Sequence, residues 1–378
     1  LTVGSVDEGA VIYGNGKTRL FAVVNASLSL RDIIVDNGKA KFGGAIAASR
    51  SELSLNGVTF QGKNASSSGG AMYLLNGATA SFGEDTFFIQ NTASKSGAVS
   101  LNSGSNASWI GNSTFLENSS SSGGGGAVYL GESSNVVWTE ASHFLRNRAF
   151  RGGGALIVLE GSSVLWTSTS HFLGNFAYDF GGAFVLNDLG STIAIYGSTR
   201  FVNNTCDANG GGMALVQSLD VSFDSENVTF SGNHAEVLGG GAFIEGIAMG
   251  TVFTNVTFVR NSAQSGGGVH STGSGTAVTI DGDSQVENPT TFVGCRFTEN
   301  FAFATGGAVD SAFGKDVFID TLFKGNKAGV GGALRLAGTT SVKNCSFYEN
   351  LSELGGGPAV SNIGYMTNVT HSSFNDNI

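Results

Sequence analysis

The residues of this 378-residue sequence that could carry chemistry include asparagines in Asn-x-Ser/Thr triplets, the acceptor pattern for N-linked glycans. Asn112, Asn227, Asn255 and Asn344 each lie three residues before a phenylalanine, and the hydroxyl residue directly precedes that phenylalanine. In a strand, the asparagine and hydroxyl then point away from the phenylalanine's face. We predict these four as the best glycosylation sites, which implies a eukaryotic secretory origin.

The other sequons fall into two groups. Further predicted glycosylation sites are Asn25, Asn106, Asn368, Asn203 and Asn64. Asn118 and Asn350, by contrast, are members of a repeated Phe-x-x-Asn motif, so we expect them to be buried and poorly glycosylated.

Histidine, tryptophan and cysteine recur at related positions. His143 and His171 directly precede phenylalanines 28 residues apart, which predicts an exposed pair, with a metal site as the alternative. Three tryptophans lie six residues before a phenylalanine and predict a packed column, with a sugar platform as the alternative: Trp109, Trp138 and Trp166. Three cysteines, too few for a disulfide framework, predict buried free thiols: Cys206, Cys295 and Cys345. We expect no metal and no cofactor.

Acidic residues that could catalyse polysaccharide cleavage are scattered. Enzymes of this kind gather aspartates or basic residues on one face to bind uronates and move protons. The candidates occupy different repeat positions: Asp220, Asp224, Asp310, Asp316 and Asp320. No histidine has an acidic residue at the matching repeat position. We therefore predict that the protein is not an enzyme, with a polysaccharide lyase or hydrolase as an alternative.

One acidic stretch, Asp281 to Glu287, lies in an unusually long repeat. It lacks the glycine and final glutamate that a calcium loop requires at set spacing. We predict a surface loop insertion at 279–291.

A repeat that spans most of the chain must position these residues. Its motif is Phe-x-x-Asn, with variants at Ile34/Asn37 and Phe60/Asn64, and it recurs at intervals of 24 to 39 residues. The phenylalanines predicted to stack are Phe88, Phe115, Phe144, Phe172, Phe201, Phe230, Phe258, Phe297, Phe323 and Phe347. The asparagines predicted to form a ladder beside them include Asn147, Asn175, Asn233, Asn261, Asn300 and Asn326.

A glycine turn and a small residue follow each asparagine, as in Gly153-Gly154-Ala155 and, in a later repeat, Gly240-Gly241-Ala242. Between turns, short alternating segments read as strands, and no segment has helical periodicity. We predict an all-β fold: a right-handed parallel β-helix of about 13 coils of roughly 28 residues, with three short strands per coil, forming one domain over 1–378. A leucine-rich solenoid is the alternative, but the leucine framework is missing.

Composition supports this assignment and excludes others. The chain has 58 glycines, only 13% charged residues and a net charge of −10, which favours strands and turns and disfavours nucleic-acid binding. Its apolar stretches are too short to span a membrane as helices.

The pairing of Phe172-Leu-Gly-Asn175-Phe-Ala177 with Gly181-Gly182-Ala183-Phe184 resembles the repeat of the chlamydial polymorphic outer membrane proteins. The resemblance covers the chain from about Ile34 onward. It implies a right-handed parallel β-helix, exported to the cell surface and used in adhesion or as a passenger scaffold.

The ends of the chain suggest assembly. The sequence stops just after its last Phe-x-x-Asn, and the N-terminal segment 1–30 contains alternating apolar stretches without a cap. We predict a secreted or cell-surface structural glycoprotein that associates head to tail with copies of itself into a filament. The alternative is a cell-surface adhesin or carbohydrate-binding β-helix.

Overall fold

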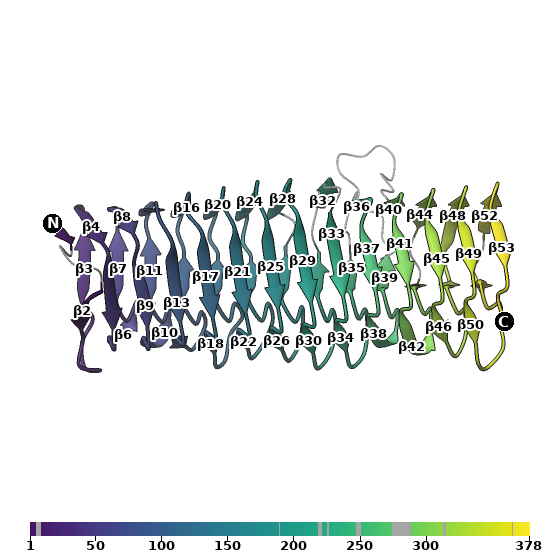
Figure 1. Ribbon diagram of the computed structural model, residues 1–378, viewed down its shortest axis with the longest axis horizontal. Coiled ribbons are helices and arrows are strands. Elements are labelled where there is room, and N and C mark those ends of the chain that lie inside the picture. Colours follow the sequence, from purple (N-terminus) through teal and green to yellow (C-terminus); the bar gives the residue numbers. More distant parts are fainter. Residues whose placement is uncertain are drawn as a thin grey trace, which may run out of the picture. The chain divides into compact units, whose positions relative to one another are not determined.

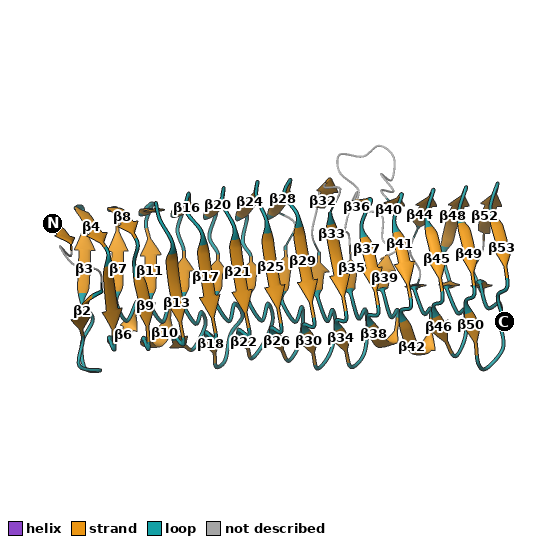
Figure 2. Cartoon of the chain, viewed as in Figure 1, coloured by secondary structure: helices purple, strands orange, loops and turns teal. Residues whose placement is uncertain are grey.

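The computed structural model describes residues 1–4, 9–188, 190–217, 221–224, 227–246, 251–273, 289–312, 315–364 and 366–378. This part of the chain consists of strands and turns, without a helix (Figure 2). It divides into two compact units, Leu1–Thr192 (unit 1) and Ile193–Ile378 (unit 2), and each is described by itself. That the chain forms one domain stays a prediction.

Each unit is a parallel β-helix. A complete coil passes in turn through strands of four sheets, here named A, B, D and C, and each strand pairs in parallel with its equivalent in the next coil (Figure 1). Parallel pairing at about 4.8 Å per coil brings equivalent side chains of successive coils together in columns.

Unit 1 contains the following strands. Sheet A has β1 (Thr2–Gly4), β4 (Ser27–Arg31), β8 (Glu52–Asn56), β12 (Thr79–Phe82), β16 (Asn106–Trp109), β20 (Asn135–Trp138) and β24 (Ser163–Trp166). Sheet B has β2 (Ala10–Tyr13), β5 (Ile33–Asp36), β9 (Thr59–Gln61), β13 (Thr86–Ile89), β17 (Ser113–Leu116), β21 (Ser142–Leu145) and β25 (Ser170–Leu173). Sheet D has β6 (Lys39–Phe42), β10 (Asn64–Ser68), β14 (Thr92–Ala93), β18 (Ser119–Ser120), β22 (Arg148–Ala149) and β26 (Phe176–Ala177). Sheet C has β3 (Phe21–Val24), β7 (Ile46–Ser49), β11 (Met72–Leu75), β15 (Val99–Leu101), β19 (Val128–Leu130), β23 (Leu156–Val158) and β27 (Phe184–Asn187).

Unit 2 repeats the arrangement, with β28 starting at the boundary. Sheet A has β28 (Thr192–Ile195), β32 (Val221–Asp224), β36 (Val252–Thr254), β40 (Thr290–Val293), β44 (Asp316–Ile319), β48 (Thr339–Lys343) and β52 (Met366–Thr370). Sheet B has β29 (Thr199–Val202), β33 (Val228–Ser231), β37 (Thr257–Val259), β41 (Arg296–Thr298), β45 (Leu322–Lys324), β49 (Ser346–Tyr348) and β53 (Ser373–Asn375). Sheet D has β30 (Thr205–Cys206), β34 (His234–Ala235), β38 (Ser262–Ser265), β42 (Phe301–Thr305), β46 (Lys327–Ala328) and β50 (Leu351–Ser352). Sheet C has β31 (Met213–Val216), β35 (Ala242–Gly246), β39 (Val269–Gly273), β43 (Val309–Ser311), β47 (Leu334–Leu336) and β51 (Val360–Asn362).

The short D strand is the one that the sequence did not predict, since three strands per coil were expected. The residue before each ladder asparagine adopts a left-handed conformation, as Arg146 does at φ 51°. This turns the chain, so that Arg148 and Ala149 run in a new direction before the glycine turn. Most strands of sheet D have only two residues, too few to show an alternating pattern in the sequence.

The glycine turn needs glycine for two different reasons. Gly153 has φ 62°, which residues with a side chain rarely adopt, and a Cβ on Gly154 would lie 1.9 Å from the carbonyl oxygen of Gly182 in the next coil. In the later repeat the predicted alignment Gly240-Gly241-Ala242 is wrong by one residue. Ala242 pairs with Met213, so Gly241 takes the place that alanine holds elsewhere.

The first repeats also shift by one residue. Val35, not the predicted Ile34, pairs with Phe60 and is fully buried, because it is the inward residue of its strand. Lys63, not Asn64, occupies the ladder position: its backbone N–H donates to Asn91 Oδ1 at 3.1 Å. The N-terminal segment 1–30 supplies strands β1 to β4 up to Leu30. Of the predicted insertion 279–291, only residues 289–291 are described, so the acidic stretch lies outside the described residues.

Candidate functional site

The repeated phenylalanines form stacked columns inside each unit. In unit 1 the rings from Phe60 to Phe172 stack with centroids 4.7 to 5.1 Å apart. In unit 2 the rings from Phe201 to Phe374 stack at 4.6 to 5.2 Å. The predicted stacking residues are buried in these columns: Phe88, Phe115, Phe144, Phe172, Phe201, Phe230, Phe258, Phe297, Phe323 and Phe347.

The asparagines form a hydrogen-bonded ladder beside the rings. The backbone N–H of Asn147 donates to Asn175 Oδ1 at 2.9 Å, and Asn147 Nδ2 donates to the same oxygen at 3.0 Å and to the Phe115 carbonyl at 2.9 Å. In unit 2 the corresponding bonds link Asn233, Asn261, Asn300 and Asn326. A buried amide costs free energy unless it is hydrogen-bonded, and the ladder provides that bonding in every coil.

The tryptophans lie inside the protein and not on its surface. Trp109, Trp138 and Trp166 continue a column from Phe82, with neighbouring centroids 4.4 to 5.0 Å apart, and are at most 1% exposed. This is the packed column that was predicted, and a ring that is buried in the core cannot serve as a sugar platform.

The three cysteines are buried free thiols, as predicted. Cys295 and Cys345 lie just before β41 and β49, and β45 pairs with both of these strands. Thr321, just before β45, therefore lies between the two cysteines. Burial raises the pKa of Cys295 to about 12 and that of Cys345 to about 11, so both thiols are unreactive at neutral pH.

The histidine pair lies on the outward face of sheet B. The ring centroids of His143 and His171 are 5.1 Å apart, and the ring planes are inclined at 65°. Within the described ranges, no group of three or more histidine, cysteine or acidic side chains is placed to hold a metal ion.

The sequons separate by exposure. Asn112, Asn227, Asn255 and Asn344 are exposed, whereas the residue after each, such as Ser113, is buried. The remaining predicted sites are exposed or half-buried: Asn25, Asn106, Asn368, Asn203 and Asn64. The ladder asparagines Asn118 and Asn350 are fully buried, so an oligosaccharide could not be accommodated on them in the folded chain.

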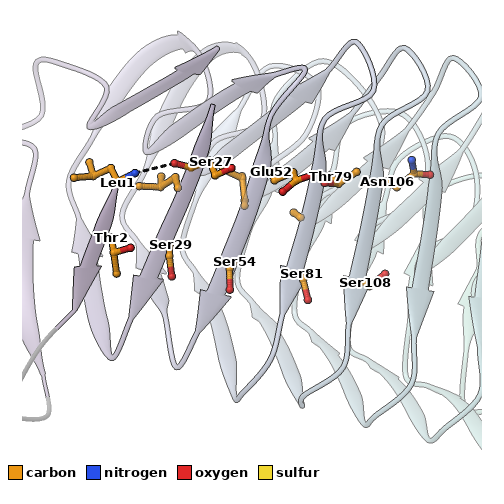
Figure 3. A pocket seen from close by; sticks show the side chains of 13 residues that line it. Leu1, Thr2, Ser27, Ser29, Glu52, Ser54, Thr79, Ser81, Asn106 and Ser108 are labelled. Carbon is orange, nitrogen blue, oxygen red and sulfur yellow. Dashed lines mark hydrogen bonds between the residues drawn. The ribbon is translucent and has the colours of Figure 1, made fainter. Parts of the chain in front are cut away.

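A shallow groove of about 510 Å³ lies on the outer face of sheet A in unit 1 (Figure 3). One column of serines runs along it through β4, β8, β12 and β16: Ser29, Ser54, Ser81 and Ser108. A parallel column contains Glu52, Thr79 and Asn106. The groove therefore presents hydroxyl groups at the spacing of the coils, a surface that can exchange hydrogen bonds with sugar hydroxyls or ordered water.

The structure also brings together an ionic cluster that the sequence did not predict. His270 of β39, Asp310 of β43 and Arg335 of β47 are in register on sheet C. Asp310 Oδ1 accepts a hydrogen bond from Arg335 Nη1 at 3.0 Å, and Asp310 Oδ2 accepts one from Thr305 at 2.7 Å. His270 Nδ1 lies 3.4 Å from Asp310 Oδ2, an ion-pair distance. The expectation that no histidine has an acid at the matching position is wrong.

Burial opposes ionisation of Asp310, but the neighbouring His270, Thr305 and Arg335 outweigh it and hold the pKa of this carboxyl below its ordinary value. The side chains of His270 and Asp310 are only 5% and 4% exposed. A carboxylate that holds a histidine is one part of many acid–base sites. Here the Thr305 hydroxyl, at the end of β42, also donates a hydrogen bond to the buried Asp310 carboxylate. We therefore interpret the contact between His270 and Asp310 as a structural ion pair.

A second carboxylate, Asp316, lies in the core close to this cluster. In unit 1 the inward column at this position is apolar and contains Val136 and Val164. Asp316 stands between Thr290 and Thr340 in the equivalent column of unit 2. Burial raises its pKa to about 6, although Ser271 donates a hydrogen bond to it at 3.3 Å.

The missed cluster had a weak signal. His270 and Asp310 are 40 residues apart because the long repeat lies between them, so the regular period does not align them. Aligning each residue by its distance from the preceding glycine turn would have done so, since His270 follows Gly266 by four residues and Asp310 follows Gly306 by four. Of the other acids considered, Asp220 lies outside the described residues, and Asp320 is at an exposed turn where it accepts a hydrogen bond from Asn344.

Comparison with protein families agrees with this geometry. Residues 97–285, half of the chain, match the family described as the right-handed β-helix region. The chain belongs to this family, and the predicted right-handed parallel β-helix is confirmed. No curated protein and no solved structure gives a significant match. In the described residues there is no helix long and apolar enough to cross a membrane.

Proposed function

We propose that the protein is an extracellular structural glycoprotein, secreted or held at the cell surface, without catalytic activity. The observation that carries the proposal is the separation of the sequons by exposure. Four side chains are exposed: Asn112, Asn227, Asn255 and Asn344. By contrast, Asn118 and Asn350 are buried in the hydrogen-bonded ladder. The outer turns can thus carry glycans without disturbing the core.

The core supports a scaffold function. Stacked rings and asparagine amides fill the same position in coil after coil, so each coil is held by its neighbours. The resemblance of the repeat to that of the chlamydial polymorphic outer membrane proteins supports a surface location. Assembly into a head-to-tail filament stays a prediction, to be tested by light scattering and electron microscopy of the native material.

Glycopeptide mapping of the native protein tests the proposal. We expect N-glycans on most of Asn112, Asn227, Asn255 and Asn344 and fewer on Asn118 and Asn350, because a chain that carried a glycan on either ladder asparagine could not bury that side chain on folding. Finding all four outward asparagines unmodified in the native protein would contradict the eukaryotic secretory assignment.

A cell-surface adhesin is the second candidate, and the hydroxyl-lined groove on sheet A favours it. Soluble neutral glycans would bind through hydrogen bonds to Ser54 and Ser81. The change Ser54→Arg should block such binding, whereas Ser163→Arg, farther along the same sheet, should leave it intact. Equal binding by both variants would remove the groove from consideration.

A further inference from the structure

One edge of unit 1 gathers positive charge in a protein whose net charge is −10. We call it the D edge: the strands of sheet D in unit 1 and the turns that follow them (Figure 1), together with their outward side chains. Its basic side chains are exposed: Lys39, Lys41, Lys95, Arg148 and Arg151. Within residues 39–42, 64–68, 92–95, 119–123, 148–152 and 176–180, the one acidic side chain is Asp179.

Aromatic rings lie at the end of the D edge nearest β26. The Phe150 ring is 50% exposed and lies 5.4 Å from the ring of Tyr178, which in turn meets Phe176 edge to face at 4.8 Å. Partly exposed rings of this kind can pack against the apolar C–H face of a sugar.

Arg148 is held in place among these rings. Its guanidinium carbon lies 4.4 Å from the centre of the Phe176 ring and 5.3 Å from that of Tyr178, and Nη2 donates to the Tyr178 hydroxyl at 2.5 Å. Because the guanidinium is already oriented, less side-chain entropy is lost when its remaining N–H groups bind an anion.

Polar uncharged side chains, most of them with hydroxyl groups, lie on the D edge between the basic residues. Asn64 Nδ2 donates to Thr92 Oγ1 at 3.0 Å, and Ser94 and Ser122 share a hydrogen bond across neighbouring coils. The turns carrying Lys95 and Arg151 are separated by the coil of β18, which places them two coil rises, roughly 10 Å, apart.

We propose that the D edge binds a linear acidic polysaccharide, one whose sugars carry carboxylate or sulfate groups. Cations that recur every second coil suit a polymer with regularly spaced anions, arginine suits the planar or tetrahedral anion, and the intervening hydroxyls suit sugar hydroxyls. Duplex nucleic acid is the poorer ligand, because it carries one charge per about 1.7 Å and the net charge of −10 repels it more strongly than a polymer with one anion per sugar.

The proposal goes beyond the scaffold function and is separate from the groove on sheet A. Its test measures binding of the full chain, prepared without glycans, to immobilised polygalacturonate, dextran sulfate and neutral dextran. We expect binding to one or both acidic polymers and none to dextran. The choice between polygalacturonate and dextran sulfate identifies carboxylate or sulfate as the recognised group.

A charge variant and a matched control locate the site. Lys95→Gln/Arg148→Gln/Arg151→Gln should weaken binding by roughly tenfold, as the loss of three exposed charge contacts suggests. Arg31→Gln/Arg50→Gln/Arg146→Gln removes the same charge from exposed positions outside the D edge and should change binding by less than about twofold. Circular dichroism confirms that both variants are folded.

The single change Phe150→Ser tests the aromatic contribution, and it does not depend on charge. It should weaken polysaccharide binding several-fold and lower the thermal midpoint only slightly, because the ring is half exposed. The proposal is overturned if neither acidic polymer binds, if the control triple variant loses as much affinity as the D-edge variant, or if single-stranded DNA binds as tightly as the polysaccharide and Phe150→Ser has no effect. Glycopeptide mapping, which tests the scaffold function, is unaffected by any of these results.

Discussion

The outward residues of sheet C differ between the two units. In unit 1 this column holds apolar side chains such as Ile157 and Val185, over which the glycine turns pack closely: a Cβ on Gly124 would lie 2.6 Å from Ile157 Cδ1. In unit 2 the column begins with the apolar Ala214 and Phe243 and continues with His270, Asp310 and Arg335. Ile157 and Val185 are buried in unit 1, and His270 and Asp310 are buried in unit 2. Burial therefore keeps water from hydrocarbon in the first column and from a carboxylate and its partners in the second.

The comparison shows that the β-helix backbone accepts either kind of column. Its register comes from the ladder hydrogen bonds and the inward rings, which are alike in both units. The covered column then decides how stability responds to conditions, because buried charges carry a desolvation cost that hydrocarbon does not. Between pH 4 and 7 we expect the stability of unit 2 to depend on pH and that of unit 1 to depend on it much less.

The largest expected effect tests whether the inner columns are equivalent. Phe144→Ala in unit 1 and Phe258→Ala in unit 2 each remove a ring stacked on two neighbours, and each should lower the free energy of unfolding by about 3–5 kcal/mol. Hydrogen exchange followed by mass spectrometry measures each unit separately. A difference of more than about 2 kcal/mol would show that the units differ in their cores as well.

Phe374→Ala is the control for this pair. Phe374 is 47% exposed and stacks on Phe347. Its loss should destabilise the chain clearly less than either core change, since less apolar surface returns to water.

The next effect concerns the ionic column. Asp310→Ala leaves Arg335 and His270 without their acceptor and should destabilise unit 2 by about 3 kcal/mol. Replacing all three by His270→Phe, Asp310→Val and Arg335→Leu should be neutral or stabilising, because no charged side chain remains in this column. If the triple variant proved as unstable as Asp310→Ala, the ionic contacts themselves, and not only the packing of this column, would contribute to stability.

The smallest expected effect is the pH dependence that Asp316 produces. Its folded pKa, raised to about 6, exceeds the ordinary value of 3.8, so between these values the folded state binds a proton that the unfolded state does not. Stability of unit 2 should therefore fall by roughly 2–3 kcal/mol as pH rises from 4 to 7, and Asp316→Thr should abolish this slope. Asp310, whose pKa is lowered, acts oppositely: its contribution is lost as pH falls below its ordinary range.

Tryptophan fluorescence provides the internal reference, because all three tryptophans belong to unit 1. The midpoint that it reports should move little over the same pH range, while amide exchange in β39, β43 and β44 accelerates. Equal pH slopes in both units would break the contrast drawn between the covered columns.

Much of the fold could be predicted because the repeat is short and local. Phe144 and Asn147 are three residues apart, and their geometry depends on one left-handed residue between them, so the motif reads the same in every coil. The predicted register was wrong where the local sequence did not show which residue points inward. Ile34 and Val35 are both apolar, and only the pairing of Val35 with Phe60 decides which one points inward.

The cluster around Asp310 and the D edge lay beyond what periodicity could predict. Arg335 follows Asp310 by 25 residues and Asp310 follows His270 by 40, so no constant period aligns them. Likewise Lys95 and Arg148, 53 residues apart, do not form a basic run in the sequence. Stacking the coils places such residues within one or two strand spacings of each other.

The sequence alone was sufficient for the parallel β-helix, the inward phenylalanines and asparagines, and the outward sequons, because each depends on strand alternation within a few residues. The tertiary structure was needed for the fourth strand, for Lys63 at the ladder position and for the charges that meet across coils. The physical reason is that parallel pairing converts a separation of one whole coil into direct contact. Because insertions change coil length, the position of a side chain after its glycine turn, and not its separation in the sequence, decides which charged side chains become neighbours.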